Sequence, residues 1–510
     1  MSVSRISQLH VTLIVLGVLA EFVAAWTLGL GRDYFNHLAR TYIQAHLGSD
    51  PFLAQFYAVS FDFIPDLTMD LIVPWLSKVI GIYAAGGVTV WLAYILAPLA
   101  GVILSKTLNG RITWLSLIGF LTVFNGSMDF GFVNYVASSG LALFGFILWI
   151  RMAPSWRRTI AFLPVGLFLV INHALAFLMF GFLVLLWELL SFAQNERGSR
   201  WRFVRQLVSL DLPAMLPALF YLGMSLRGAA DLPQGVSQLY SLPAKMQTLF
   251  AATQFHNALL AAILAAAIIG FFVLALREGW IKFAPKMGWI CGALLALVIL
   301  VPSAIFGIWG LHLRFVAPLV ILVAASVQVT PEFGSIQRRV SIGVFAVLGG
   351  AMLVNGAVQM ARLDAQANAL QSVLADLPEG ATVLNVFSDP DVDSAFTAHA
   401  ASMAVIERSA FIPNLFTNTS LVDVTPQMVD LHMPQALPAM AARLPIYAQR
   451  PAASSSNGFW SPNFADAWPE RWDYLLVFAD SNFQGLSELP VCAVSATPGI
   501  ILYKTEPCTN

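Results

Sequence analysis

Long runs of apolar residues, separated by short polar segments, dominate the first two thirds of the chain. Eleven of these runs are long enough, or nearly so, to cross a bilayer core of about 30 Å as helices. They cover 9–30, 79–105, 112–126, 131–150, 159–172, 174–193, 207–226, 256–276, 288–307, 315–330 and 340–361. The pattern predicts a polytopic α-helical membrane protein with about eleven spanning helices.

Some of these runs leave alternatives open. The runs at 112–126 and 159–172 are short, so tilted, broken or partly re-entrant segments also fit them. The stretch 159–193 is too long for one helix and barely long enough for two. Asn172 and His173 lie at its centre and indicate a polar turn between two helices.

The pattern changes after residue 361, where no further run is long enough to span. Strand-like runs occur at 382–387, 474–478 and 499–503, and a helical pattern covers about 364–376. We therefore expect a transmembrane domain at 1–361 and a small α/β soluble domain at 362–510. The first loop between spanning runs, 32–78, is long and rich in aromatic residues, which predicts helices lying at the membrane interface.

Composition supports a membrane protein and places the domain boundary. Hydrophobic residues make up 58% of the chain and charged residues 11%, with a mean hydropathy of +0.74; soluble domains carry about 25% charged residues. Residues 1–361 contain 21 Lys and Arg against 13 Asp and Glu, whereas 362–510 contain 6 against 15. A soluble segment this acidic is a poor nucleic-acid partner.

The basic residues also predict which loops face the cytoplasm. With a cytoplasmic N-terminus and alternating helices, 15 of the 21 basic residues in 1–361 fall on the cytoplasmic side. This asymmetry supports an odd number of helices and a C-terminal domain outside the cytoplasm.

Cys492 and Cys508 lie in the C-terminal domain, where a disulfide between them is expected to form. Cys291 lies in an apolar run and is expected to pack there.

The densest group of polar residues follows the first apolar run, from Gly31 to Arg40. On a helix, Asp33, His37 and Arg40 would share one face, because their spacing is i, i+4 and i+7. A carboxylate, an imidazole and a guanidinium at the membrane surface can perform acid–base chemistry or bind an anion. A solvated interfacial helix with a snorkelling arginine explains the same pattern without any function.

A second candidate carboxylate is Asp129, at the predicted outer start of the helix over 131–150. Asn134 follows about one helical turn deeper and is a candidate for substrate binding. An N-cap or first-turn carboxylate, stabilised by the helix dipole, would also account for Asp129.

Three further aspartates, Asp62, Asp66 and Asp70, recur at steps of four and would align on a helix that Pro65 interrupts or kinks. A solvated helix face is the main interpretation, and a metal site is the alternative.

Several cationic or titratable residues lie at predicted outer membrane boundaries: His173, His256, His312 and Arg314. Arg314 lies on the side poor in positive charge, where a cation beside apolar helices would suit a lipid-linked phosphate. Snorkelling of Arg314 to water, and structural hydrogen bonding by the histidines, are the alternatives.

The sequence has no P-loop, GxSxG, HExxH or CxxC motif, which argues against ATP-driven transport, serine-hydrolase and zinc-protease chemistry.

Taken along its whole length, the chain resembles the GT-C superfamily of membrane glycosyltransferases. The stretch from Gly31 to Arg40 stands where that family has its first acidic motif, and Asp129 with the stretch from Gly131 to Tyr135 stands where it has the second. A first helix that opens into a large outer loop, and a soluble domain at the end of the chain, also match. One departure is the single Asp33 in place of an adjacent acidic pair, which weakens the case for a family-style metal site.

This resemblance implies an inverting transfer of a sugar from a polyprenyl phosphate to a glycan, lipid or protein acceptor at the outer face of a bacterial inner membrane. It implies catalytic roles for Asp33 and Asp129, which would also hold a divalent cation, Mg²⁺ or Mn²⁺, if the reaction uses one. Substrate-binding roles are expected for His37, Arg40, Asn134, His173, His256, His312 and Arg314. Membrane lipids are the other expected partners.

Two rival functions remain. A lipid or solute transporter or flippase would need ionisable residues deep within helices, and Glu21, Glu188 and Asp211 are few and scattered along the chain. A non-catalytic assembly protein predicts that the polar residues named above do not converge.

Overall fold

The computed structural model describes residues 32–194, 199–228, 242–254, 257–305, 308–389, 397, 399–417, 420–433, 438–451 and 463–508. The predicted first helix at 9–30 lies outside these residues. The described chain divides into two compact units. We call residues 65–68 and 88–359 the helical unit, and residues 32–64, 69–87 and 360–508 the mixed unit.

The helical unit consists almost wholly of helices. It contains most of α5 (Ile82–Asn109), η1 (Trp114–Thr122), α6 (Gly126–Asp129), α7 (Val133–Arg151), α8 (Trp156–Asn172), α9 (Ala174–Ala193), α10 (Arg200–Gln206), η2 (Leu207–Asp211), α11 (Leu212–Gly228), α12 (Leu242–Gln247), η4 (Thr248–Ala252), α13 (Ala258–Arg277), α14 (Met287–Leu300), α15 (Leu311–Arg314), α16 (Val316–Ser326) and the first part of α17 (Ser335–Leu374). Two short antiparallel pairs accompany them, β2 (Ile281–Phe283) with β5 (Val327–Val329), and β3 (Ala304–Ile305) with β4 (Ile308–Trp309).

Six helices of the described chain are long and apolar enough to cross a membrane: α5, α7, α9, the continuous segment Arg200–Arg227, α13 and α17. Met287–Leu300 and Leu311–Ser326 are apolar but shorter. The expected run at 112–126 is not one spanning helix, because it forms the nine-residue 3-10 helix η1 followed by the single turn of α6. At about 2 Å per residue, η1 is far shorter than a bilayer core. The count of about eleven spans therefore stays a prediction.

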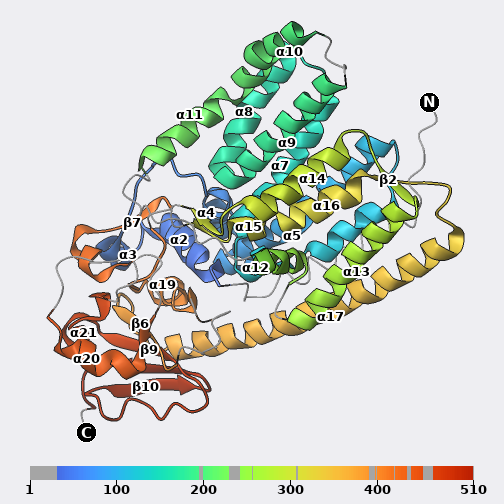
Figure 1. The fold of residues 1–510 in the computed structure, drawn as a ribbon. Coiled ribbons are helices and arrows are strands. Elements are labelled where there is room, and N and C mark those ends of the chain that lie inside the picture. The colour runs from blue at the N-terminus through green and yellow to red at the C-terminus, as the bar shows by residue number, and fades with distance from the viewer. Residues whose placement is uncertain are drawn as a thin grey trace. The chain divides into compact units, whose positions relative to one another are not determined.

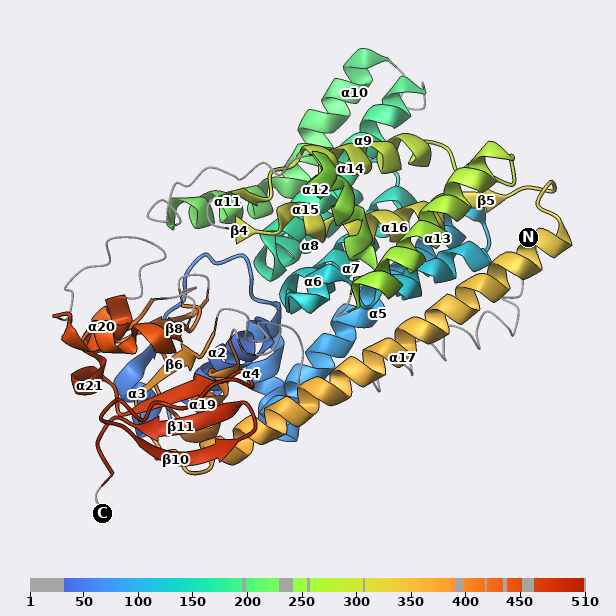
Figure 2. The same ribbon diagram turned by 60° about the horizontal axis from the view of Figure 1, so that its bottom comes forward.

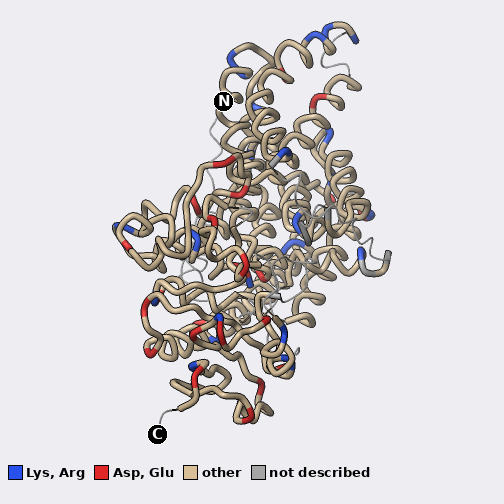
Figure 3. Tube along the Cα trace, turned by 90° about the vertical axis from the view of Figure 1, so that its left-hand side faces the viewer, with Lys and Arg blue, Asp and Glu red and all other residues tan. Residues whose placement is uncertain are grey.

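Apolar side chains cover much of the outside of these helices. Val340, Val347, Val354 and Val358 of α17 are all exposed, as are Leu259 and Val273 of α13. Figure 3 shows long stretches of the trace without any charged residue. Exposed apolar surface on this scale requires an apolar solvent, as expected for an integral membrane protein.

The predicted polar turn inside 159–193 is confirmed. His173 has an extended backbone, with φ at −167°, and it separates α8 from α9. Its side chain accepts a hydrogen bond from the backbone N–H of Leu175 and so caps α9.

A buried charge cluster ties together the helices around α8. Arg158 donates to Glu188 of α9 at 3.0 Å and to Asp211 of η2 at 2.5 Å. Gln206 donates to both carboxylates at 2.9 Å, and Trp149 of α7 donates to Glu188 at 2.9 Å. Glu188 and Asp211 are thus not scattered, as their sequence positions indicated, but share one arginine in what we call the Arg158 cluster.

The mixed unit is built around a five-stranded sheet of order β10-β11-β9-β6-β8. Its strands are β6 (Val383–Phe387), β8 (Ala439–Met440), β9 (Tyr474–Phe478), β10 (Cys492–Thr497) and β11 (Ile500–Lys504). The strand β6 is parallel to β8 and β9, whereas β11 is antiparallel to β9 and β10. Figures 1 and 2 show this sheet with α20 (Leu444–Gln449) and α21 (Trp468–Arg471) beside it. The three strands predicted from the sequence are confirmed, and β6 and β9 are fully buried, as their apolar residues require.

Residues of the first loop belong to the same compact unit as this sheet. They form α2 (Tyr34–His46), α3 (Pro51–Phe56), β1 (Tyr57–Val59) and α4 (Thr68–Ile80). The strand β1 pairs antiparallel with β7 (Val422–Val424), and α2 packs against α19 (Met403–Arg408). The boundary predicted at 361 and 362 lies close to the division of the chain at 359 and 360, but the mixed unit also takes in this loop.

The helix α4 presents an apolar face to the outside. Leu71, Trp75 and Val79 are spaced by four residues and are exposed, Trp75 by 72%. The ammonium of Lys78 lies 4.9 Å from the ring of Trp75. An exposed apolar stripe with an aromatic and a cationic residue is typical of a helix at a membrane interface, which supports that prediction for the first loop.

The last helix is longer than the sequence indicated. The spanning run at 340–361 and the separate helical pattern at 364–376 form one helix, α17, of 40 residues. At 1.5 Å per residue it is about 60 Å long, roughly twice the thickness of a bilayer core.

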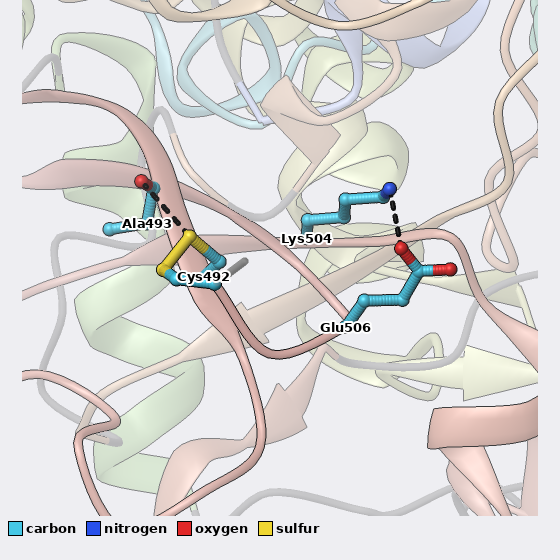
Figure 4. Close-up of a disulfide and its surroundings, with 5 residues drawn as sticks. Cys492, Ala493, Lys504 and Glu506 are labelled. Atoms are coloured by element: carbon cyan, nitrogen blue, oxygen red, sulfur yellow. Dashed lines mark hydrogen bonds and ion pairs between the residues drawn. A yellow bond between two sulfur atoms is a disulfide. The ribbon is translucent and has the colours of Figure 1, made fainter. Parts of the chain in front are cut away.

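The predicted disulfide between Cys492 and Cys508 is confirmed. Figure 4 shows it beside β10, near the ion pair of Lys504 and Glu506.

Candidate active site

Asp33 stands at the beginning of α2 without capping it. It occupies the N-cap position, but its side chain makes no capping hydrogen bond. Its Oδ1 lies 3.6 Å from Nε2 of His399, and the two side chains are 21% and 12% exposed. An aspartate at an N-cap normally accepts backbone N–H groups. Here the carboxylate faces an imidazole instead.

The residues around this pair are firmly held. Asn36 is fully buried, and its Nδ2 lies 3.2 Å from Nδ1 of His399. The ring of Phe416 packs edge-on against His399, at 4.7 Å between centroids, and against His37, at 5.9 Å. We call Asp33, Asn36, His37, His399 and Phe416 the Asp33 cluster.

Arg40 has a different environment from Asp33, although both belong to the predicted shared helix face. It is fully buried and donates to Asp70 of α4 at 2.9 Å, and Gln44 donates to the other carboxylate oxygen at 2.5 Å. Among the described residues, Nε and Nη1 of Arg40 have no hydrogen-bond partner. The three aspartates expected to align on a helix do not, because α4 begins at Thr68, after Asp62 and Asp66.

In the helical unit, the segment 65–68 is bound to α7 and to the turn between α8 and α9. Asn134 donates to the backbone oxygen of Asp66 at 3.0 Å. Thr68 lies 3.0 Å from the hydroxyl of Ser138 and 3.1 Å from Oδ1 of Asn172. These bonds hold Asp66 beside His173, with 3.9 Å between Oδ1 and Nε2.

A second set of contacts in the helical unit surrounds Arg314. Its Nη1 lies 3.1 Å from Nε2 of His173, and its guanidinium stacks over the ring of Phe132 at 4.0 Å. Tyr135 donates its hydroxyl to the backbone oxygen of Arg314 at 2.6 Å, which fixes the end of α15. Arg314 is therefore buried and oriented, rather than extended toward water.

The contacts of His173 indicate an anion site. Burial and the neighbouring Arg314 lower the pKa of His173, so the imidazole is neutral at pH 7. Nδ1 of His173 faces the backbone N–H of Leu175, and Nε2 lies 3.1 Å from Nη1 of Arg314, so the ring is held at both nitrogens. This contact in turn holds the guanidinium of Arg314. A buried and oriented guanidinium favours the binding of an anionic oxygen.

The other predicted site residues lie as follows. Asp129 is buried in α6, which packs against α15. Asn125 caps α6, so Asp129 is not its N-cap. A cavity of about 20 Å³, large enough for one water, lies beside Arg314, Tyr135 and Ser127. His312 is buried in α15. His256 lies outside the described residues.

The divalent cation predicted with Asp33 and Asp129 stays a prediction. No three His, Cys, Asp or Glu side chains among them gather in a way that could hold a metal ion. We therefore derive no step through a metal.

His399 is the site residue that the sequence did not reveal. It lies more than 360 positions after Asp33 and carries no motif. Asn36 was visible within the first acidic motif, three residues after Asp33, but nothing in its spacing indicated that it would contact a histidine.

No protein-family model matches the sequence, and no characterised protein matches it in sequence. Solved structures do match its fold. The structure of ArnT from Cupriavidus metallidurans bound to undecaprenyl phosphate covers 98% of this chain and 98% of its own, with 9% identity and a TM-score of 0.58. The apo state of the same protein gives a TM-score of 0.57 over 97% of both chains. The oligosaccharyltransferase AglB from Archaeoglobus fulgidus reaches only 0.37, too low to establish a common fold.

The chain thus has the fold of ArnT over almost its whole length. This likeness confirms the membrane fold that the sequence resemblance implied.

Proposed function

We propose that the protein is an inverting glycosyltransferase that moves a sugar from a polyprenyl phosphate to an acceptor at the outer face of the membrane. The observation that carries the proposal is the buried guanidinium of Arg314, held by His173 and Phe132, in a chain with the fold of ArnT. The ArnT structure is described as bound to undecaprenyl phosphate, so a phosphate on a lipid chain is the anion that Arg314 would bind.

The reaction needs a base and a group that stabilises the leaving phosphate. The acceptor oxygen forms a bond to the anomeric carbon from the face opposite the phosphate, while the bond from that carbon to the phosphate oxygen breaks. The phosphate keeps the bonding electrons, and the acceptor proton passes to the carboxylate of Asp33. Arg314 donates to the phosphate as its charge increases, and His173 holds the guanidinium in place.

We assign the phosphate to Arg314 rather than Arg40, because Arg40 is sealed from solvent and paired with Asp70. Asp129 stays the second proposed carboxylate, since its helix packs against the one that carries Arg314. We assign the acceptor side, the mixed unit and the C-terminal domain to the periplasm of a bacterial inner membrane, because a cytoplasmic N-terminus gives the observed distribution of basic residues.

The transporter alternative has no support. Of its three candidate ionisable groups within helices, Glu188 and Asp211 are both satisfied by Arg158 and Gln206, and Glu21 lies outside the described residues. A closed ion cluster of this kind offers no vacant site for a transported ion.

The test uses binding and turnover of the purified full chain in detergent. Arg314→Gln should weaken binding of undecaprenyl phosphate, measured by native mass spectrometry, by at least about 10-fold, which is the loss of one charge-assisted hydrogen bond. The control, Arg227→Gln, alters an exposed basic residue expected on the same side and should bind normally. Asp33→Asn should retain binding but release no undecaprenyl phosphate from a lipid-linked sugar. Equal binding by the Arg314 variant and wild type would refute the phosphate assignment.

A further inference from the structure

The orientation of Asn36 in the Asp33 cluster is fixed by two backbone groups. Its Oδ1 accepts from the N–H of Phe416 at 2.7 Å, and its Nδ2 donates to the backbone oxygen of Asn414 at 2.9 Å. A flipped amide would place an acceptor against the oxygen of Asn414 and a donor against the N–H of Phe416. Nδ2 is therefore the atom that faces His399.

This orientation determines the tautomer of His399. Nδ2 of Asn36 can only donate, so Nδ1 of His399, 3.2 Å away, must accept and carry no proton. Burial lowers the pKa of His399 to about 4, so the imidazole is neutral at pH 7. Its one proton then lies on Nε2, the atom 3.6 Å from Oδ1 of Asp33.

The tautomer also decides which member of the pair can act as a base. His399 presents a lone pair only to Asn36 and an N–H only toward Asp33, so it has no lone pair for a substrate. Asp33 keeps its carboxylate oxygens as acceptors. An N–H near one oxygen orients the carboxylate and favours its charged form. At 3.6 Å the contact is longer than a hydrogen bond, as is common in sites without substrate.

We propose that His399 is a positioning residue for Asp33, with its tautomer set by Asn36, so that the segment after the last membrane helix supplies part of the catalytic machinery. The inference rests on the proposed function for the role of Asp33 as base. The arrangement lies wholly within the mixed unit.

The tautomer can be tested without any activity. We would label the histidines of the full chain with ¹⁵N and identify the His399 signals by their absence from His399→Gln. We expect protonated Nε2 and unprotonated Nδ1 at pH 7. Asn36→Asp replaces the donor by an acceptor of the same shape and should move the proton to Nδ1. A wild-type His399 protonated on Nδ1 would overturn the proposal, even if Asn36→Asp does not fold.

The positioning role can be tested by turnover. His399→Phe keeps an aromatic ring against Phe416 but has no N–H, and should lower kcat by about 10-fold or more with little change in KM for the lipid-linked donor. The acid limb of its kcat/KM profile should move to higher pH, because Asp33 loses a donor to its charged form. His399→Gln can place an N–H near the position of Nε2 and should restore both properties in part.

The control, His46→Gln, alters the last residue of α2, the helix that follows Asp33, and should behave like the wild type. An unchanged kcat and acid limb in His399→Phe would refute the positioning role while leaving the glycosyltransferase intact. A wild type without transfer would instead refute the proposed function, and the ¹⁵N spectrum would still report on the tautomer.

Discussion

The Arg158 cluster and the Asp33 cluster use similar side chains in opposite ways. Around Arg158, every carboxylate oxygen of Glu188 and Asp211 accepts a hydrogen bond of 2.5 to 3.0 Å, and the groups are sealed from solvent. At Asp33, Oδ1 lies 3.6 Å from Nε2 of His399, and the carboxylate is partly exposed. Buried carboxylates saturated by donors hold helices together, whereas a partly exposed carboxylate beside a firmly fixed imidazole is placed to react.

The sharpest way to break the first cluster is Arg158→Met. It leaves two buried carboxylates side by side without a cation, which typically costs about 3–5 kcal/mol. We expect the largest fall in melting temperature of any variant described, measured in detergent by intrinsic fluorescence. Arg157→Gln is the matched control, because Arg157 is exposed and should have almost no effect. Melting of Arg158→Met at the wild-type temperature would show that the cluster does not stabilise the fold.

Arg40→Met extends the comparison to the helix that follows Asp33. It leaves Asp70 buried with Gln44 as its remaining donor, so we expect a loss of about 3 kcal/mol, at the lower end for a broken buried pair. Arg40→Met combined with Asp70→Leu removes both charges and should recover part of the loss. If the double variant melts no higher than the single one, the pair does not behave as a buried ion pair.

How well the sequence predicted each structural feature depends on how far apart in the chain the interacting residues lie. Local patterns identified the helices α7 and α9, the turn at His173, and the strands β6 and β9, because apolar runs and polar breaks act over a few residues. The run at 112–126 was not distinguishable from a short span, because hydropathy does not separate a 3-10 helix from an α-helix. The continuity of α17 was also hidden, since its composition changes from apolar to polar along one helix.

The site was predictable only in part, for the same reason. Spacing placed Asp33, His37 and Arg40 together, but each found a different partner: His399, Phe416 and Asp70. His399 and Phe416 come from the other end of the chain, and no periodicity links them to α2. Contacts of that range are set by tertiary packing, which a single sequence does not encode in a readable pattern.

Acid should weaken the mixed unit in part through His399, since burial lowers the pKa of both His399 and His432 there to about 4. The pKa of His399 falls from about 6.5 in the unfolded chain to about 4 in the folded one, because burial disfavours the charge. The contribution of His399 to the free energy of unfolding is complete above the unfolded pKa. It is lost as the pH falls from about 6.5 toward 4, because only the unfolded state then binds the proton. From pH 7 to pH 5 we expect a loss on the order of 1–2 kcal/mol.

Melting curves of wild type and His399→Gln across this pH range provide the measurement. The variant should lose less stability than the wild type between pH 7 and 5, because glutamine does not titrate. Equal losses in the two proteins would mean that His399 is not the group that takes up the proton. The Arg158 cluster contains no histidine and should contribute nothing to the difference.

The substitution with the smallest expected effect on stability, that of Asp33, distinguishes the two clusters best. Asp33 and Asp50 are both aspartates at N-cap positions in the mixed unit, but only Asp50 accepts backbone N–H groups, from Phe52 and Leu53. Asp50→Ala should therefore cost about 1 kcal/mol or more, whereas Asp33→Ala removes no cap and should cost less than Asp50→Ala while abolishing transfer. A carboxylate whose removal stops the reaction without loosening the fold is retained for its chemistry. Should Asp33→Ala melt as low as Asp50→Ala, Asp33 would belong with Arg158 among the structural charges, and the contrast between the two clusters would no longer hold.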